Sequence, residues 1–389
     1  MTPEPSPAAL AVLDHPDPLV LVDGALRATL GGASRPAMLV YLAASSRLLD
    51  LRPGAMACHA LVHGPPSAGK SATLHAVRRL LPPEAVVVID AASPYVLIYG
   101  NSDLRHKALF IGEADSLPAG EDNPAASAIR NLMTDGYLHY QVVVPDRATA
   151  KFVVRHVEKA GPTALITTAT RPLGEQLMSR LFLIELPDDQ KQLRAVLAAQ
   201  ARLEVEDVPP ADPGLVAFQA YLQELAPIPV TVPFAPQLAA ALGGVPVGAR
   251  ITRDFTKLLS LIKSATVCRI GQRDRDERGR VIATPADYDA VRDLAGELYA
   301  ASTDDVGRPI REVVRAVAEL PAILKPGIPV TVDFVARHLG VHKSNASRRL
   351  ANAERDGWIV NRETRRGCPA NLALGRSLPG RPGLPDLRL

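Results

Sequence analysis

Short apolar runs alternate with helix-like segments through the first half of the chain. Runs typical of buried strands occur at Ala60–His63, Ala85–Ile89, Ala108–Ile111 and Thr163–Thr168. Apolar residues at helical spacing fill the stretches between them, as in Leu74, Val77, Leu80 and Leu81. Strands that alternate with helices indicate a parallel sheet covered by helices. We therefore predict an α/β domain over residues 57–203.

Helical patterns and proline-rich stretches surround this domain. Residues 21–56 carry helical patterns, and two further helical stretches near 250–270 and 285–300 predict a helical lid over 204–302. Proline-rich residues 1–20 and the Pro/Gly-rich tail 376–389 predict disorder at both ends.

The segment 309–375 combines three helical patterns with two short apolar runs. The helices are expected at Ile310–Leu320, at Val332–Leu339 and from His342 to Arg355. A basic loop joins the apolar runs, as in a hairpin. This order predicts a winged helix-turn-helix, whose third helix enters the major groove of DNA. The alternative is a winged helix that contacts only protein.

The DNA contacts expected from this fold lie on its third helix and its wing. The helix would offer His342, Lys343, Ser344, Asn345, Ser347 and Arg348. The wing would place Arg365 and Arg366 against phosphates.

A complete phosphate-binding loop occupies residues 64–71, which read Gly-Pro-Pro-Ser-Ala-Gly-Lys-Ser between an apolar run and a helical pattern. Strand, loop and helix are the context that this motif requires. Its glycines let successive N–H groups face the phosphates at the positive end of the helix. Lys70 would reach the β- and γ-phosphates, and Ser71 would bind Mg²⁺. We predict ATP binding by Gly64, Pro65, Pro66, Ser67, Ala68, Gly69, Lys70, Ser71 and Ala72.

Two carboxylates follow the apolar run Lys107–Ile111. Glu113 has the position of a residue that polarises the attacking water, so we predict it as catalytic together with Lys70. Gly112 stands where an aspartate usually precedes this glutamate, which leaves Asp115 as the nearest acid for the metal. The alternative is that both acids only cap the next helix.

A hydroxyl and two arginines complete the predicted site. Thr170 ends the next strand, where a polar side chain can hold the lytic water. Arg180 precedes a further apolar strand; in ring-forming ATPases an arginine there reaches the γ-phosphate of the neighbouring subunit. Arg253 begins a helix from which it could reach back to the nucleotide. The alternative for each arginine is a solvated surface charge.

Charge and cysteine usage narrow the class of protein. The net charge is +3, but residues 331–389 carry eleven Lys and Arg against five Asp and Glu. A basic end suggests a polyanionic partner, although such a bias is as often only a solvated surface. Three scattered cysteines, Cys58, Cys268 and Cys368, predict free thiols in a cytoplasmic protein without a zinc site. No run is long enough to cross a membrane.

The order of these motifs over about residues 36–300 resembles the AAA+ ATPases. Within them the chain is similar to minichromosome-maintenance-type helicases, through Leu177–Ile184 and Arg253–Ile262. Through Ser46–Leu49 and Glu158–Thr168 it resembles the helicase modules of primase–helicase proteins on phages and integrative elements. The resemblance implies a ring, expected to be a hexamer, that moves on DNA during replication of a mobile element. The alternatives are a helicase loader or ATP-gated DNA-binding regulator, and a P-loop protein without a DNA role.

The stretch between the Glu113 and Thr170 strands carries two β-rich runs joined by Pro145–Ala150, which predict a hairpin. The resemblance implies that this hairpin projects into the ring channel, where Arg147 and Lys151 hold single-stranded DNA. The alternative is an ordinary edge hairpin whose charges only increase solubility.

Overall fold

The structure is a computed structural model. It describes residues 3–31, 34–90, 95–114, 124–145, 151–169, 175–186, 190–205, 210–243, 251–302, 306, 308–363, 365, 368–378 and 383–387. The chain forms two compact units: the first comprises residues 1–241, 249–298 and 386–389, and the second comprises 242–248 and 299–385. Each unit has its own architecture.

A five-stranded parallel sheet forms the centre of the first unit. Its strands are β1 (His59–His63), β2 (Val86–Ile89), β3 (Lys107–Ile111), β6 (Thr163–Ala169) and β7 (Leu181–Glu185). Their order is β2-β3-β6-β1-β7, and every neighbouring pair is parallel. The predicted α/β fold is thus confirmed at the level of a parallel sheet with flanking helices.

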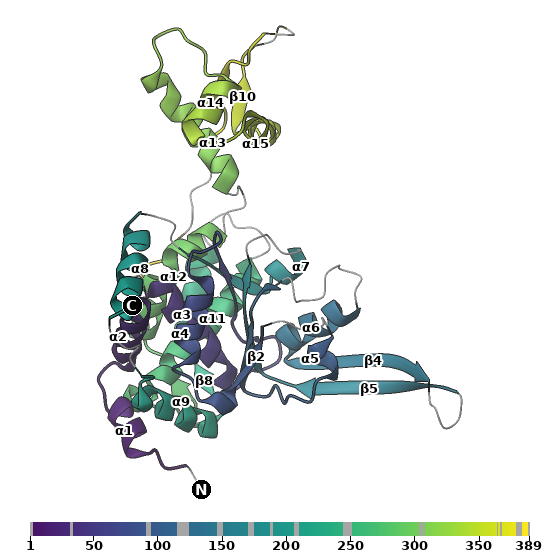
Figure 1. The fold of residues 1–389 in the computed structure, drawn as a ribbon, viewed down its shortest axis with the longest axis vertical. Helices are drawn as coiled ribbons and strands as arrows, with labels where there is room; N and C mark the ends of the chain where they lie inside the picture. The colour runs from purple at the N-terminus through teal and green to yellow at the C-terminus, as the bar shows by residue number, and fades with distance from the viewer. Residues whose placement is uncertain are drawn as a thin grey trace. The chain divides into compact units, whose positions relative to one another are not determined.

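Helices cover both faces of the sheet (Figure 1). On one side lie α3 (Arg35–Ser45) and α4 (Lys70–Arg78). On the other lie α5 (Val96–Tyr99), α6 (Pro124–Asp135) and α7 (Glu175–Met178). Side chains of these last three helices pack with alternate strand residues, including Leu61, Leu109 and Leu165. The sheet is therefore buried on both faces, as its continuous apolar strands require.

The N-terminus differs from the predicted disorder. Residues 7–13 form helix α1, which packs on α9 (Pro213–Leu225), and α2 spans Pro18–Leu30. Asp17 caps α2 and also forms an ion pair with Arg269 at 2.8 Å. Ala9 is fully buried. Proline is compatible with these helices because it occupies their first turn, where an N–H has no helical partner.

The remaining helices of the first unit are α8 (Gln190–Leu203), α10 (Ala235–Gly243), α11 (Ile251–Cys268) and α12 (Pro285–Ser302). Single 3₁₀ turns occur at Ser46–Leu48, Pro83–Ala85 and Ile270–Gln272. A short parallel pair joins β8 (Val230–Thr231) to β9 (Val281–Ile282). The predicted helices near 250–270 and 285–300 are confirmed, whereas α9 and α10 were not predicted as separate helices of the lid.

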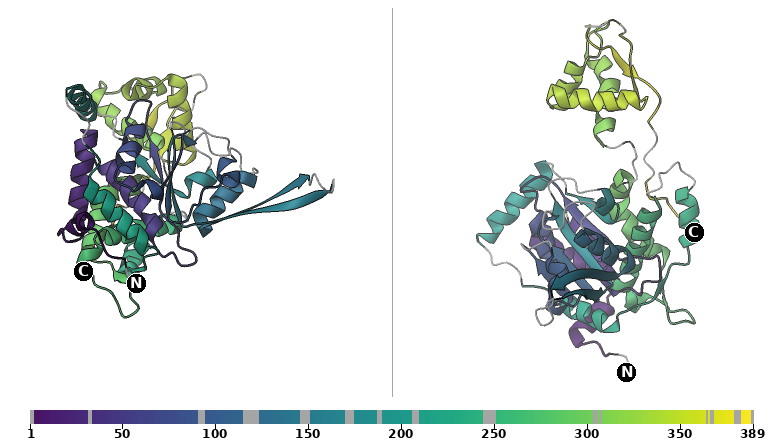
Figure 2. Two further views of the ribbon diagram at one scale, coloured as in Figure 1. Left: turned by 60° about the horizontal axis from the view of Figure 1, so that its bottom comes forward. Right: turned by 90° about the vertical axis from the view of Figure 1, so that its right-hand side faces the viewer.

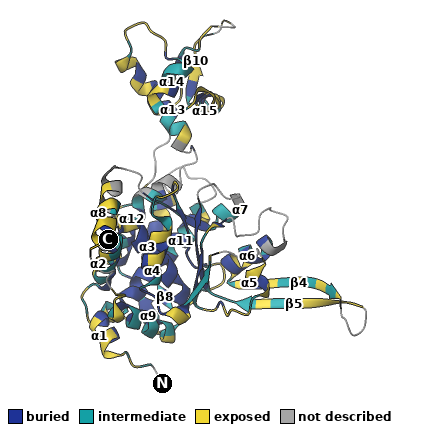
Figure 3. Cartoon of the chain, viewed as in Figure 1, coloured by how far each residue is buried: buried dark blue, intermediate teal, exposed yellow. Residues whose placement is uncertain are grey.

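A long antiparallel hairpin extends from this unit (Figure 2). It pairs β4 (Tyr137–Pro145) with β5 (Phe152–Ala160), as the sequence predicted. Its base packs on α6. In its distal half the residues of β5 are exposed, and those of β4 alternate between exposed and intermediate (Figure 3). Phe152 is 77% exposed and Val143 is 62% exposed. Lys151 is exposed beside Phe152, and Arg147 lies outside the described residues.

The second unit contains three helices and a two-stranded antiparallel sheet. The helices are α13 (Arg308–Ile323), α14 (Val332–Leu339) and α15 (Lys343–Arg355), and the strands are β10 (Ile359–Asn361) and β11 (Leu372–Leu374). The Thr331 hydroxyl accepts from the N–H of Phe334 and so caps α14. Gly340 ends the helix at φ 63°, in the left-handed region that glycine adopts without strain. The three helices and both strands share one apolar core.

Candidate active site

The predicted phosphate-binding loop connects β1 to α4. Ser67 and Gly69 both have positive φ, at 67° and 89°, which curls the backbone ahead of the helix. Helix α4 begins at Lys70, and its N-cap residue, Gly69, has no side chain with which to cap it. The first N–H groups of a helix have no intrahelical partner and carry the positive end of its dipole. This helix end can therefore accept an anion.

Two contacts fix the shape of the loop. A Cβ atom at Gly64 would lie 3.3 Å from Cβ of Ala68 and 3.4 Å from Cβ of Leu186, so the loop folds closely against the chain that follows β7. The Lys70 ammonium donates to the carbonyls of Gly64 at 3.0 Å and Pro65 at 2.8 Å. Lys70 thus lies across the loop, where its charge faces the space that the backbone encloses.

Glu113 lies at the same end of the parallel strands as this loop, the carboxyl end, which is called the carboxyl edge below. In the parallel register Ile111 is level with Thr167, and His63 is level with Ala169. Glu113, two residues beyond Ile111, is therefore level with the end of β1. Only β6 separates β3 from β1, which places these two strand ends about 10 Å apart. The Glu113 side chain is exposed at the edge where open parallel sheets bind ligands.

The donors at this edge are hydroxyl and carboxylate oxygens. Ser71 is exposed in the first turn of α4, while Asp90 and Glu113 follow β2 and β3. Mg²⁺ prefers oxygen ligands and is usually held by one or two carboxylates together with substrate phosphates. This donor set therefore fits Mg²⁺ bound with a nucleotide. The predicted residues Asp115 and Thr170 lie outside the described part of the chain.

Arg180 lies at the opposite end of the strands, the amino end, which is called the amino edge below. It precedes Leu181, which is level with His59 at the start of β1. The four-residue rise of β1 puts this edge about 13 Å from the phosphate-binding loop. The guanidinium donates to the Thr134 hydroxyl at 2.9 Å and to the Gln176 carbonyl at 2.6 Å. Arg180 therefore does not face the loop of its own chain.

Arg253 lies near Arg180 and not near the phosphate-binding loop. Its guanidinium donates to the Ser179 hydroxyl at 2.8 Å, and its side chain is exposed. Burial, followed by the nearby charges of Arg253 and Arg130, lowers the pKa of Arg180. The sequence predicted that both arginines contact a nucleotide, and the structure places them side by side at the amino edge of the sheet. An anion at this edge would relieve their mutual repulsion.

A buried ion pair that the sequence did not suggest holds this arrangement. The Lys257 ammonium lies 2.6 Å from the Asp254 carboxylate, and both side chains are almost fully buried. Lys257 also donates to the carbonyls of Leu181 at 3.0 Å and Ser179 at 3.3 Å. Helix α11 is thereby attached to the chain around Arg180. The signal for this ion pair in the sequence was a lysine three residues after an aspartate, within an apolar helical pattern.

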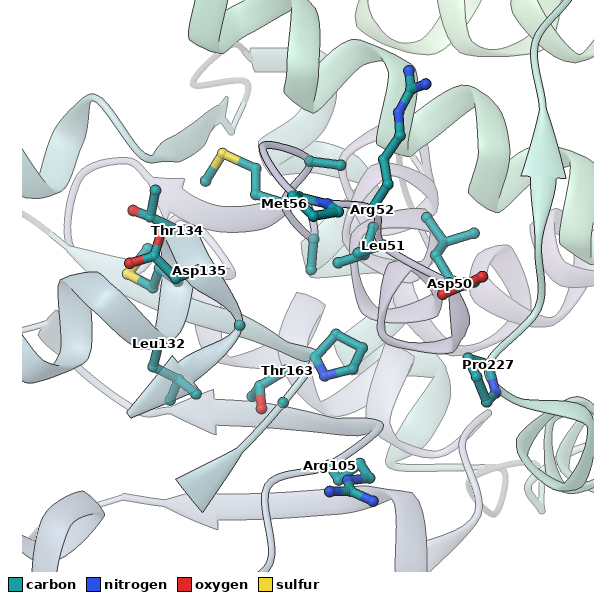
Figure 4. A pocket seen from close by; sticks show the side chains of 18 of the residues that line it. Asp50, Leu51, Arg52, Met56, Arg105, Leu132, Thr134, Asp135, Thr163 and Pro227 are labelled. Carbon is teal, nitrogen blue, oxygen red and sulfur yellow. The ribbon is translucent and has the colours of Figure 1, made fainter. Parts of the chain in front are cut away.

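A cavity of about 590 Å³ opens at the amino edge of the sheet (Figure 4). Its lining includes Arg52, Arg105, Thr134, Asp135 and Thr163. Thr163 begins β6, so the cavity lies at the far edge from the phosphate-binding loop. It therefore belongs to the surroundings of Arg180, whose hydrogen-bond acceptor Thr134 forms part of its wall.

The predicted DNA contacts of the second unit lie at its surface. His342, Lys343, Ser344, Asn345, Ser347 and Arg348 are all exposed in the first half of α15 or just before it. Lys343 lies 3.3 Å from Asp333, and Arg365 forms a bidentate pair with Glu363. Within the described residues no such partner engages Arg348. Arg366 lies outside them.

Comparison with known proteins does not place the chain in a family: no family model matches it, and no curated protein matches it either. Among the helices described, none is both long and apolar enough to cross a membrane.

Proposed function

We propose that this protein is a ring-forming AAA+ ATPase that moves on DNA as a helicase or translocase, expected to be hexameric. One observation carries the proposal. The Gly64–Ser71 loop opens a helix whose N-cap residue is Gly69, and Glu113 lies at the same end of the strands, level with the end of β1. A triphosphate on the loop would place its γ-phosphate in the space between β1 and β3.

Each residue of this edge has a defined part in the reaction. The loop N–H groups and Lys70 hold the phosphates, and Lys70 exchanges its two carbonyl partners for phosphate oxygens. Glu113 accepts a hydrogen bond from the attacking water and orients it. Mg²⁺, bound by Ser71 and the phosphates, would neutralise charge that develops during phosphoryl transfer. The catalytic gain comes from positioning and electrostatics at this edge.

The amino-edge arginines support a shared site between subunits. Arg180 is about 13 Å from its own loop, too far for direct contact. In a ring, the amino edge of one subunit would face the phosphate-binding loop of the next. Arg180 and Arg253 would then contact the neighbour's γ-phosphate together. This proposal revises the sequence-based expectation that Arg253 reaches the nucleotide of its own chain.

Two features support a DNA substrate. The hairpin presents an exposed aromatic residue, Phe152, next to a cation, Lys151. Stacking platforms beside basic side chains bind single-stranded nucleic acid with little sequence preference. The second unit has the element order of a winged helix-turn-helix, with α15 as recognition helix and the loop between β10 and β11 as wing. The exposed first half of α15 would enter the major groove.

The first experiment separates ATP binding from hydrolysis. Lys70→Ala is expected to abolish ATP turnover and to weaken nucleotide binding, because the γ-phosphate loses its cation. Glu113→Gln is expected to bind ATP as the wild type does but to turn over at least about a hundredfold more slowly. The measurements are affinity for a fluorescent ATP analogue and steady-state phosphate release. Wild-type turnover in Glu113→Gln would remove the assignment of this residue as the catalytic carboxylate.

The second experiment tests the shared site. Arg180→Ala and Glu113→Gln proteins should each be inactive, whereas a mixture should recover part of the ATPase activity. A mixed ring contains interfaces in which one subunit supplies Glu113 and the other Arg180. Arg202→Ala, at an exposed arginine of α8, is the matched control and should stay active. Mixtures that stay inactive although the protein is oligomeric would mean that Arg180 acts only within its own chain.

Unwinding is tested last, on forked DNA with ATP. Strand displacement supports a helicase, whereas DNA-stimulated ATPase without displacement would indicate a loader or an ATP-gated regulator.

A further inference from the structure

Residue 112 is a glycine, and Asp90 of the neighbouring strand lies close to it. Strands β2 and β3 pair with Ile89 level with Ile111, and the N–H of Gly112 donates to the Ile89 carbonyl at 2.9 Å. Asp90 therefore lies directly beside Gly112. A Cβ atom built on Gly112 would be 3.1 Å from the carbonyl oxygen of Asp90 and 3.5 Å from its carboxylate Oδ1. The Asp90 side chain thus borders the space that a residue at 112 would fill.

Glycine at 112 and aspartate at 90 fit together. A contact of 3.1 Å to a backbone oxygen is tighter than nine in ten real Cβ contacts, so a side chain at 112 would require the Asp90 backbone to shift by a few tenths of an ångström. Gly112 removes that conflict and leaves room for the carboxylate of the neighbouring strand. The Thr168 hydroxyl donates to the Gly112 carbonyl from the other side. Position 112 is therefore held by β2 and by β6.

The Asp90 carboxylate can also accept hydrogen bonds from a bound ligand. It is exposed, and within the described residues no hydrogen bond or ion pair engages it. It lies at the carboxyl edge of the sheet, as Glu113 and the phosphate-binding loop do. A carboxylate at this place can accept hydrogen bonds from water molecules on a divalent cation. Carboxylates that contact such waters orient them and tune the affinity for the metal.

We propose that Asp90, from β2, supplies the carboxylate that Gly112 of β3 lacks, and that it positions the hydrated Mg²⁺ of the bound nucleotide. This inference rests on the proposed ATPase function and deepens it. Asp90 acts as a positioning residue through the metal-bound waters, whereas Glu113 contacts the attacking water. Because β2 pairs with β3, residues 90 and 112 lie side by side. A carboxylate from β2 can therefore take the place of one from β3.

The test compares Asp90→Asn with Glu84→Gln. Glu84 is an exposed acid just before the amino end of the same strand, so the second variant removes one charge far from the loop. Two quantities are measured for each: the affinity for a fluorescent ATP analogue with Mg²⁺ and with EDTA, and the Mg²⁺ concentration that gives half-maximal turnover. Asp90→Glu is included as the conservative variant.

In Asp90→Asn we expect the half-saturating Mg²⁺ concentration to rise about tenfold or more. Affinity in EDTA should stay at the wild-type value, which also shows that the variant is folded. Glu84→Gln should match the wild type, and Asp90→Glu should recover most of the Mg²⁺ affinity. A wild-type Mg²⁺ response in Asp90→Asn overturns the proposal, as does an equal loss of affinity with Mg²⁺ and with EDTA.

These outcomes are distinguishable from failure of the ATPase proposal. If the wild type binds the analogue no better than Lys70→Ala, the nucleotide site itself is refuted and this inference is refuted with it. If the wild type binds in a Mg²⁺-dependent way and Asp90→Asn does too, only the role of Asp90 is refuted.

Discussion

His59 begins β1, the strand that leads into the loop at residues 64–71, and its imidazole is buried between two other elements. Its Nδ1 accepts from the N–H of Leu165 at 3.0 Å, and its Nε2 is 2.9 Å from the Met133 carbonyl. These contacts need the neutral ring with its proton on Nε2. Burial lowers the pKa of His59 from 6.5 to about 4, although the bond to Met133 opposes the shift. The imidazole thus joins β1 to β6 and α6 in its neutral form only.

This lowered pKa makes stability depend on pH. Between pH 6.5 and pH 4 the unfolded chain binds a proton at His59 that the folded chain does not, so stability decreases as the pH falls. The full effect is about 3 kcal/mol. His59→Asn, whose amide oxygen can still accept from Leu165, should reduce the slope of unfolding free energy against pH in this window. Denaturant unfolding at several pH values measures it, and parallel curves for the two proteins would contradict the assignment.

Helices far apart in the sequence are joined by one buried carboxylate. Asp287, at the start of α12, is fully buried and contacts Arg269 at 3.2 Å and Arg273 at 2.5 Å. Arg269 continues the network to Asp17, at the cap of α2. The network therefore connects the N-terminal helices to α11 and α12. It gives the physical reason for order where a proline-rich sequence predicted disorder.

Asp287→Ala is expected to destabilise the first unit by about 3–5 kcal/mol, because the largely buried Arg273 loses its counter-ion and Arg269 keeps only Asp17. Asp289→Ala removes an exposed carboxylate from the same helix and should cost at most about 1 kcal/mol. The measurement is the shift in denaturant midpoint. Proteolysis within residues 7–30 should also become faster in Asp287→Ala. Similar stability of the two variants would mean that the network contributes little.

Under the proposed function, DNA would contact two different kinds of surface on this molecule. Deleting residues 309–389 should weaken duplex binding and flatten its dependence on salt. If Lys343, Arg348 and Arg365 each contact one phosphate, the logarithmic salt slope falls by about 2–3. ATPase activity should remain, because the proposed nucleotide site lies entirely in the first unit. A truncated protein that binds duplex with an unchanged slope would refute the winged-helix assignment.

Single substitutions test the α15 surface and the hairpin surface separately. Arg348→Ala, in the exposed first half of α15, should lower the slope by about 0.9. Arg355→Ala, in the last turn of the same helix and paired with Asp356, is the matched control. Lys151→Ala in the hairpin should instead spare duplex binding and reduce the stimulation of ATPase by single-stranded DNA.

Local features of this protein were determined by the sequence alone. The loop at 64–71 is a contiguous motif, so its strand, turn and helix follow from adjacent residues. The helices of the second unit begin and end at nearby signals, such as Thr331 and Gly340. The hairpin followed from two β-rich runs on either side of a turn. Periodicity and capping act over a few residues, and a single sequence contains them in full.

The relation between distant residues was decided only by the tertiary structure. The register of β7 against β1 and the Lys257 contacts of α11 place Arg253 beside Arg180. The pairing of β2 with β3 brings Asp90 to Gly112, 22 positions away in the chain. Burial of Asp287 among arginines orders the N-terminus. Each of these depends on which surfaces pack together, and packing is a property of the whole fold that no local pattern records.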